Sequence, residues 1–257
     1  MDRNSLSDRN VAGVIGMLSD SSAAEFIYSQ AKKMMWSVVE YKEIQMLYTC
    51  AIKEIKTKLD ILDTEFKVRY KRNPISSISS RLKRTESVIE KLHRRGYPLT
   101  IESIEHNIND IAGVRVICSY VDDVYAIADA LLAQDDIKLL SRKDYIHNPK
   151  DNGYRSLHLI VTVPVFLSES RKEVKVEVQI RTIAMDYWAS LEHQMKYKKD
   201  IPDAERVSRQ LREVAEDMAR TDRRMLELRR DIELAEDAVS EEDELFDRLG
   251  RIGMPLY

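Results

Sequence analysis

The stretch from Asn152 to Thr182 restricts the fold of this chain more than any other part of the sequence. It contains the apolar run Leu159–Val165, a short polar turn, and then a segment that reads Lys-Val-Glu-Val-Gln-Ile-Arg-Thr. Apolar and polar residues alternate in that last segment, and a period of two is typical of a strand with one buried face. The stretch therefore predicts two strands, with Val174, Val176, Val178 and Ile180 facing a core.

The opposite face of the second strand is polar. It presents Lys175, Glu177, Gln179 and Arg181, which are one carboxylate, one amide and two cations. Such a set suits a phosphate ligand with a metal ion, and it suits water equally well. Alternation alone leaves open whether this face binds a ligand or is a solvated sheet surface.

Composition limits the class of protein. The chain has 257 residues, 44% of them hydrophobic and 33% charged, which predicts a soluble, helix-rich globular protein of one large or two small domains. Its net charge of −3 argues against general nucleic-acid or membrane binding, so an anion site must come from a local cluster. Cys50 and Cys118 lie in apolar surroundings and suggest buried thiols in a reducing compartment. Without a visible signal or membrane-length apolar run, we expect a cytoplasmic protein.

Long helical segments flank the predicted strands. Residues 1–20 suggest a flexible tail, and the segment from Ser22 to Tyr70 has no Gly or Pro and helical apolar spacing, which predicts one long helix or two in tandem. We expect a main domain over residues 21–200, an amphipathic helix over 201–240 and a tail over 241–257. The 201–240 helix has an apolar stripe that could pack on its own domain or on a partner subunit; it includes Val207, Leu211, Val214, Met218, Met225, Leu228 and Ile232.

Strands flanked by helices are expected between those segments. We expect helices over Thr100–Asn109, Asp122–Ala133 and Ala184–Lys199, and strands over Asp110–Tyr120 and Ile137–Leu140. A polar loop is expected from Ser141 to Gly153.

The region from Lys67 to Arg95 is basic, with ten Lys and Arg residues against two Glu. A helix is predicted from Thr85 to Arg95, ended by Gly96. Ser87, Lys91 and Arg94 share one face of it, while Val88, Ile89 and Leu92 should face the core. A basic run is often only a solvated surface. The shared face and the few acids favour a ligand with several negative charges, such as a nucleoside triphosphate.

Four blocks of sequence together identify a known pattern. They are Arg81-Leu-Lys83-Arg-Thr-Glu-Ser87 with Lys91 and Arg94, Asp110-Ile-Ala-Gly-Val-Arg115, Lys150-Asp-Asn-Gly-Tyr154-Arg-Ser-Leu-His158, and Glu177-Val-Gln179-Ile-Arg181-Thr with Trp188 and Glu192-His193. With these blocks in this order, the chain resembles the synthetase domain of the RelA/SpoT homologues, and most closely the single-domain small alarmone synthetases.

The resemblance implies a fold and an activity. The expected fold is α+β, a mixed β-sheet with a nucleotidyltransferase-like synthetase core flanked by helices, including long N- and C-terminal helices. The expected reaction, that of a GTP diphosphokinase, moves pyrophosphate from ATP to the 3′ hydroxyl of GDP or GTP and releases AMP. The resemblance also implies Mg²⁺ and a homotetramer.

It further implies roles for particular residues. Asp110 and Glu177 would be catalytic and would bind the metal, with Glu177 either sharing the ion or accepting the proton of the attacking hydroxyl. ATP would be held by Arg81, Lys83, Ser87, Lys91, Arg94 and Arg115, the last of which could instead contact the acceptor. GDP or GTP would be held by Lys143, Lys150, Tyr154, His158, Gln179 and Arg181, with Tyr154 stacked on guanine.

Two other functions fit parts of the pattern. Some relatives pyrophosphorylate the 3′ end of tRNA, and a binding protein could keep the fold without catalysis. The arginines between Arg206 and Arg230 alternate with acids, however, which predicts a salt-bridged surface rather than an RNA-binding patch. The sequence has no His-Asp pair, so the hydrolase activity of larger family members is not expected. Asp186 replaces an Asn frequent in the family, which could weaken a polar contact.

Overall fold

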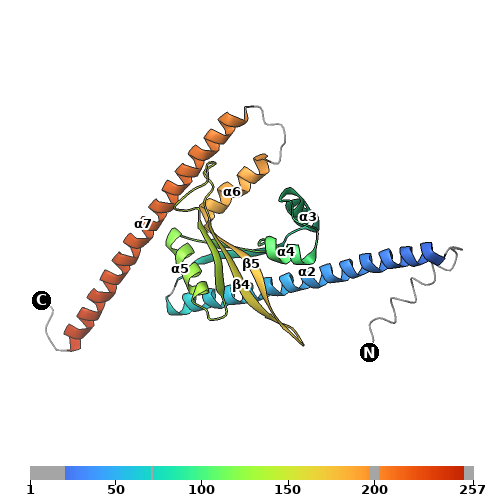
Figure 1. The fold of residues 1–257 in the computed structure, drawn as a ribbon. Helices are drawn as coiled ribbons and strands as arrows, with labels where there is room; N and C mark the ends of the chain where they lie inside the picture. Colours follow the sequence, from blue (N-terminus) through green and yellow to red (C-terminus); the bar gives the residue numbers. More distant parts are fainter. Residues whose placement is uncertain (1–20, 71, 197–202, 252–257) are drawn as a thin grey trace.

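The computed structural model describes residues 21–70, 72–196 and 203–251, and the predicted tail over residues 1–20 lies outside them. Its centre is a five-stranded sheet in the order β1-β2-β5-β4-β3 (Figure 1). The strands are β1 (Ile75–Leu82), β2 (Ala112–Cys118), β3 (Lys138–Asp144), β4 (Leu157–Phe166) and β5 (Arg171–Thr182). Only the pair β2 and β5 is parallel, so the sheet is mixed. The α+β prediction is confirmed.

Two helices cover one face of the sheet. Helix α2 (Ser21–Arg69) is a single continuous helix, and α5 (Val121–Leu132) lies beside it. Between them and the sheet is the hydrophobic core, which includes the predicted inward residues Val176, Val178 and Ile180, each fully buried. Because every second residue of β4 and β5 points into this core, the intervening residues must face the other side.

Helices α3 (Thr85–Arg94) and α4 (Ile101–Asn107) follow β1 and lie near the end of the sheet that bears that strand. Helix α3 ends before Gly96, whose φ of +71° confirms the predicted stop. Val88 and Leu92 are buried, but Ile89 is 47% exposed. The prediction that Ile89 faces the core is therefore wrong, because α3 is covered on only one narrow side.

The edge strand β3 differs from the sequence prediction. A loop was expected from Ser141 onward, but the strand continues to Asp144 and pairs only with β4. Its last residues are Ser-Arg-Lys-Asp, a polar composition that hides a strand signal but is common at sheet edges. This extension moves Lys143 from a loop to a defined position on the sheet.

Helices α6 (Ile183–Lys196) and α7 (Ala204–Arg251) complete the fold. Helix α7 extends beyond residue 240, where we expected it to end, since no Gly or Pro interrupts it before Gly250. Only part of the expected apolar stripe packs on the domain. Met218 faces the domain, whereas Met225, Leu228 and Ile232 are about half exposed or more. Within the described ranges, no helix has the length and apolar character that crossing a bilayer requires.

Several arginines of α7 pair with acids. Arg206 pairs with Asp203 at 2.9 Å, Arg220 pairs with Asp217, and Arg229 pairs with Asp122 at 2.5 Å. At these positions the predicted salt-bridged surface is confirmed.

Candidate active site

Strand register brings the predicted residues together on the face of the sheet that α2 and α5 leave open. Gly113 of β2 pairs with Arg81 on one side and with Glu177 on the other. Gln179, two residues further along β5, pairs with Arg115 of β2 and with His158 of β4. His158 in turn pairs with Lys143 of β3. The polar face of β5 is thus the middle of a surface on which the predicted site residues of all five strands lie side by side.

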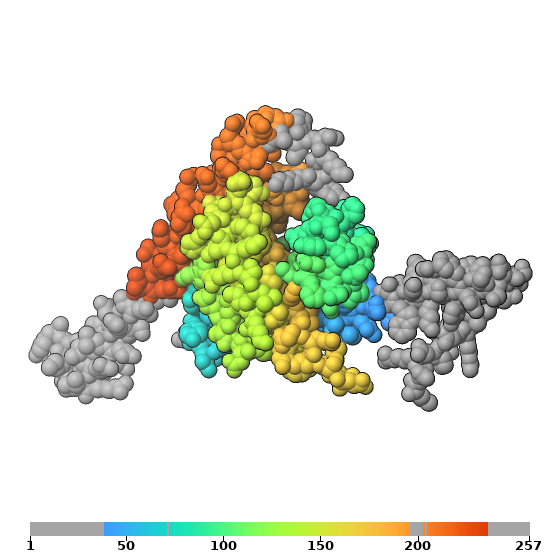
Figure 2. All heavy atoms as spheres, viewed as in Figure 1, coloured from blue at the N-terminus to red at the C-terminus, as the bar shows by residue number. Residues whose placement is uncertain are grey.

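A cleft of about 250 Å³ opens on this surface. Its lining residues are Ser79, Ser80, Arg81, Gly113, Val114, Arg115, Glu177 and Gln179. Gly113 contributes no side chain, and a Cβ there would lie 3.6 Å from Cγ of Arg81. Figure 2 shows the molecule hollowed between the α3–α4 segment and the segment that includes β3. Ser79 was missed by sequence reasoning because a serine in a strand carries no distinctive signal.

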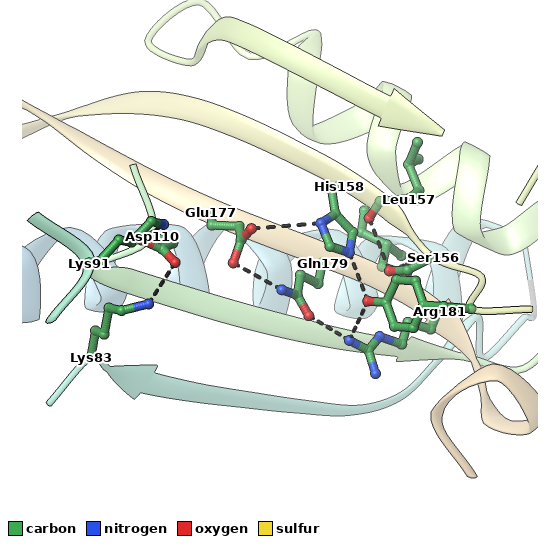
Figure 3. Close-up of polar contacts among 11 residues, drawn as sticks. Lys83, Lys91, Asp110, Ser156, Leu157, His158, Glu177, Gln179 and Arg181 are labelled. Carbon is green, nitrogen blue, oxygen red and sulfur yellow. Dashed lines mark hydrogen bonds and ion pairs between the residues drawn. The ribbon is translucent and has the colours of Figure 1, made fainter. Parts of the chain in front are cut away.

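Asp110 lies just before β2 and is held by two cations. Its Oδ2 accepts from Nζ of Lys83 and its Oδ1 from Nζ of Lys91, both at 2.8 Å (Figure 3). Burial alone would raise the pKa of Asp110, but the hydrogen bonds and charges of the two lysines hold that pKa below its usual range. Asp110 is therefore ionised, and it joins the basic stretch before β2 to the basic face of α3.

A continuous chain of hydrogen bonds connects the polar residues of β4 and β5. Nη2 of Arg181 donates to the hydroxyl of Tyr154 at 2.8 Å and to Oε1 of Gln179 at 2.6 Å. The amide Nε2 of Gln179 donates to Oε2 of Glu177 at 2.9 Å, and Nδ1 of His158 lies 3.7 Å from Oε1 of Glu177. Figure 3 shows Glu177 in contact with both Gln179 and His158, with Asp110 further along the same face. The carboxylate of Glu177 is held from two sides.

His158 is neutral in this setting. Burial, followed by the charges of Arg181, Lys150 and Lys143, lowers its pKa to about 3. A neutral ring has one donor and one acceptor nitrogen, and Nε2 lies 2.8 Å from the hydroxyl of Tyr154. The arrangement that satisfies both contacts has the Tyr154 hydroxyl donating to Nε2, while Nδ1–H points toward Glu177. His158 therefore orients the carboxylate without adding positive charge.

Substituting His158 with Gln should reduce the acid sensitivity of folding. Because the folded-state pKa is below the ordinary value of 6.5, the unfolded chain binds a proton that the folded chain does not. The stability due to neutral His158 is complete above about pH 6.5 and is lost as pH falls toward 3, by at most about 1.4 kcal/mol per pH unit. Urea unfolding at pH 7.5 and 5 should show that wild type loses about 1–2 kcal/mol more than H158Q. Equal losses of unfolding free energy in wild type and H158Q would contradict a neutral, buried His158.

An aromatic and cationic cluster borders the site at Tyr154. Nζ of Lys150 lies 4.7 Å from the ring centroids of both Tyr145 and Tyr154, and the guanidinium of Arg181 lies 5.3 Å from that of Tyr154. Burial raises the pKa of Tyr154, so its hydroxyl stays protonated. Tyr145 was not predicted, although its spacing after Lys143 could have suggested that it belongs here. The cluster offers a flat, positively charged surface to a ligand ring.

Asp186, at the start of α6, binds two arginines of the site. Its Oδ1 accepts from Nη1 of Arg181 at 3.2 Å and lies 3.4 Å from Nη1 of Arg115. Burial lowers the pKa of Arg181, which is only 4% exposed, but leaves it charged. Asp186 therefore compensates cations that could otherwise meet phosphate.

The remaining candidates are placed less centrally. Ser87 and Arg94 are on α3 with Lys91, and like Lys91 they are not among the described residues that line the 250 Å³ cleft. His193 is exposed on α6, and Cys118 is fully buried at the end of β2, where burial raises the pKa of its thiol. In the described part of the chain, no group of three or more His, Cys, Asp or Glu residues could hold a metal by itself. The separate carboxylates of Asp110 and Glu177 suit a hard ion that also binds phosphate oxygens.

Arg81, Arg115 and Glu177 line the cleft, and Asp110 lies further along the same face between two lysines. The Tyr154 cluster is joined to Glu177 through Arg181 and Gln179. This arrangement defines a site for nucleotide phosphate transfer. Residues 80–202 match the family described as "Region found in RelA / SpoT proteins". The chain is 40% identical over 194 residues to GTP pyrophosphokinase YwaC of Bacillus subtilis, covering 76% of this chain and 92% of that protein. It is 35% identical over 202 residues to GTP pyrophosphokinase YjbM of the same organism, covering 78% and 94%.

Solved structures of similar proteins point to the same family. Small alarmone synthetase 1 of Bacillus subtilis, bound to its product pppGpp, matches with a TM-score of 0.68 and 36% identity over 75% of this chain and 98% of that one. Small alarmone synthetase 2 of Bacillus subtilis matches with a TM-score of 0.67 and 42% identity over 75% and 99%. The chain belongs to the RelA/SpoT family and, within it, to the small alarmone synthetases.

Proposed function

We propose that this chain is a GTP pyrophosphokinase that transfers pyrophosphate from ATP to the 3′ hydroxyl of GDP or GTP and releases AMP. The observation that carries this proposal is the placement of Asp110 and Glu177 on one sheet face, between the lysines of the ATP pattern and the Tyr154 cluster. Relatives named GTP pyrophosphokinase, alike over most of their length, support it.

The cations on the β1 and α3 side of the cleft would hold the ATP phosphates. Lys83 and Lys91 already bind a carboxylate, so they are positioned for anionic oxygens, and Arg81 reaches the cleft from β1. Ser87 and Arg94 would extend this surface along α3, and Arg115 would contact phosphate in the middle of the cleft. Because two nucleotides carry several negative charges, this concentration of cations is needed to bind both in one site.

The β4 and β5 side would receive the acceptor. Tyr154 and Lys150 would contact its base, while Lys143, His158, Gln179 and Arg181 would contact ribose or phosphate. Glu177 would accept the proton of the 3′ hydroxyl as that oxygen bonds to the β-phosphorus of ATP. The bond from that phosphorus to the α–β bridging oxygen breaks, and AMP leaves. Gln179 and His158 would keep the carboxylate aimed at the hydroxyl.

Asp110 and Glu177 would also hold Mg²⁺, which when bound supplies positive charge against the phosphates. The donor set fits this ion because both groups are carboxylates, and Asp110 is kept ionised by its neighbours. No further protein ligand is required, since magnesium commonly takes substrate oxygens and water.

The direct test uses the full chain with magnesium, labelled ATP and either GDP or GTP, followed by separation of the nucleotides. AMP should appear in step with a pyrophosphorylated guanosine nucleotide. Label transfer only after addition of tRNA would instead assign the chain to the tRNA-modifying relatives, and no transfer to either would leave a binding protein.

We also infer that the protein is a cytoplasmic homo-oligomer, with four copies as the expected state. The half-exposed apolar side chains Met225, Leu228 and Ile232 on α7 support association, because a monomer would leave this stripe in water. A monomeric mass by light scattering at micromolar concentration would refute it.

Replacing Asp186 with Asn should tighten substrate binding. The change removes a negative charge that Arg115 and Arg181 now share, while keeping the size and hydrogen-bonding capacity of the side chain. We expect KM for at least one nucleotide to fall roughly threefold to tenfold, since contacts with charged groups in partly buried sites contribute about 1 kcal/mol or more. Steady-state kinetics check this, with Glu173→Gln as control because it removes an exposed ion pair with Arg171. An unchanged or higher KM would contradict it.

A further inference from the structure

The loop from Lys150 to Arg155 carries two of the proposed acceptor-binding residues, Lys150 and Tyr154, and part of its support comes from α7. Arg212 of α7 donates to the carbonyl oxygen of Asp151 from Nε at 2.6 Å and also from Nη2. In the opposite direction, Nη1 of Arg155 donates to the carbonyl oxygen of Ala215 at 3.2 Å. The loop and the helix are therefore linked by reciprocal contacts on either side of Gly153.

At Gly153 the loop backbone rests directly on the helix. The φ of this residue is +88°, and a Cβ there would lie 2.6 Å from Cβ of Ala215 and 3.3 Å from Cα of Arg212. Ala215 is only 4% exposed. No side chain larger than a methyl group separates the two segments, so a larger residue at position 215 would push the loop away.

Helix α7 is itself bound to β5, the strand that carries Glu177, and to α6, the helix that follows it. The hydroxyl of Thr182, which directly follows Arg181, donates to Oδ2 of the buried Asp222 at 2.6 Å. Nε1 of Trp188 on α6 donates to the carbonyl oxygen of Leu211 at 2.8 Å. Along α7, the residues that contact the loop lie between Leu211, which binds α6, and Asp222, which binds β5. The helix therefore fixes the position of the loop relative to β5.

We propose that α7 positions the acceptor loop, with Arg212 and Ala215 as positioning residues for Tyr154 and Lys150. This role rests on the proposed function, because it assumes that the loop receives GDP or GTP. Helix α7 begins after the residues that match the family region, 80–202, so the family region does not include it. The ATP-side residues Arg81, Lys83 and Lys91 come from β1, α3 and the segment between them, which these α7 contacts do not touch. Loss of the α7 contacts should therefore weaken acceptor binding selectively.

Two variants test the proposal in different ways. Arg212→Ala removes both hydrogen bonds to Asp151, whereas Ala215→Leu leaves the Arg212 side chain in place and crowds the space that Gly153 occupies. Each should raise KM for GDP or GTP about tenfold, in keeping with the loss of hydrogen bonds from a charged donor. Each should leave KM for ATP within about twofold, because the ATP-side contacts are unchanged. Arg209→Ala is the matched control, since Arg209 is an exposed arginine on the same helix.

Hydrogen exchange of the amides of residues 151–155 supplies a readout that does not depend on activity. Exchange should be faster in R212A and A215L than in wild type and R209A. Equal exchange in R212A and R209A, or a KM for ATP that rises as much as KM for the acceptor, would overturn the positioning role. If wild type makes no product from ATP with GDP or GTP, the proposed function fails, while the exchange data still decide whether α7 orders the loop.

Discussion

Replacing Glu177 with Gln is expected to lower kcat by about 10³-fold, the range associated with loss of a general base. Gln is nearly isosteric with Glu, and its amide oxygen can still accept from Nε2 of Gln179, as the carboxylate does at 2.9 Å. What is lost is the ability to take a proton and the charge beside His158. The fold and the cations that hold ATP should be unaffected.

The measurement combines single-turnover kinetics with equilibrium binding of a non-hydrolysable ATP analogue. E177Q should bind the analogue within about threefold of wild type while forming almost no product. Asp144→Asn is a suitable control, because Asp144 is a carboxylate that binds Tyr125 and His147 away from the cleft. Turnover by E177Q close to that of wild type would show that Glu177 is not the base.

Replacing Asp110 with Asn is expected to remove most activity, by about 10²-fold or more, and to change the dependence on magnesium. Asp110 is bound to Lys83 and Lys91, so it both restrains two phosphate-binding cations and supplies a hard ligand. Without its charge, the lysines are free to bind phosphate directly, whereas the metal loses a carboxylate. Binding of ATP in the absence of magnesium should therefore be equal to wild type or tighter.

A magnesium titration of activity, paired with ATP binding with and without the ion, checks this result. D110N should require a magnesium concentration about tenfold higher or more for half-maximal activity. A purely structural Asp110 would behave differently: the variant would lose thermal stability and ATP affinity together, with the magnesium dependence of the remaining activity unchanged.

The shared face of Glu177, Gln179 and Arg181 was predictable, because strand alternation fixes which side chains point together. Once β5 is recognised by its alternation, Glu177, Gln179 and Arg181 must point together, and the register with β2 adds Arg115 and Gly113. The edge strand β3 was harder to predict, because its charged C-terminal end has the composition of a loop. Lys143 was therefore assigned to a loop. Edge strands lack the second neighbour that would select apolar residues.

Tertiary contacts explain the other differences. The exposure of Ile89 could not be foreseen, because helical spacing alone cannot show which side of an amphipathic helix is covered. The pairing of Asp110 with two lysines, and of Asp186 with Arg115, joins residues far apart in the chain. The packing of Gly153 on Ala215 left no signal except a glycine, which a turn would have explained equally well.

The parallel pairing of β2 with β5 has a consequence for newly made protein. β2 ends at Cys118 and β5 begins at Arg171, so the two central strands leave the ribosome well separated in time. A nascent chain that has exposed α2 to α5 already carries Lys83, Lys91 and Asp110, but it has no Glu177 and no α7 to order the acceptor loop. Distant strand pairs also form slowly. Alarmone synthesis by a new molecule should therefore begin only after β5 and α7 have left the ribosome.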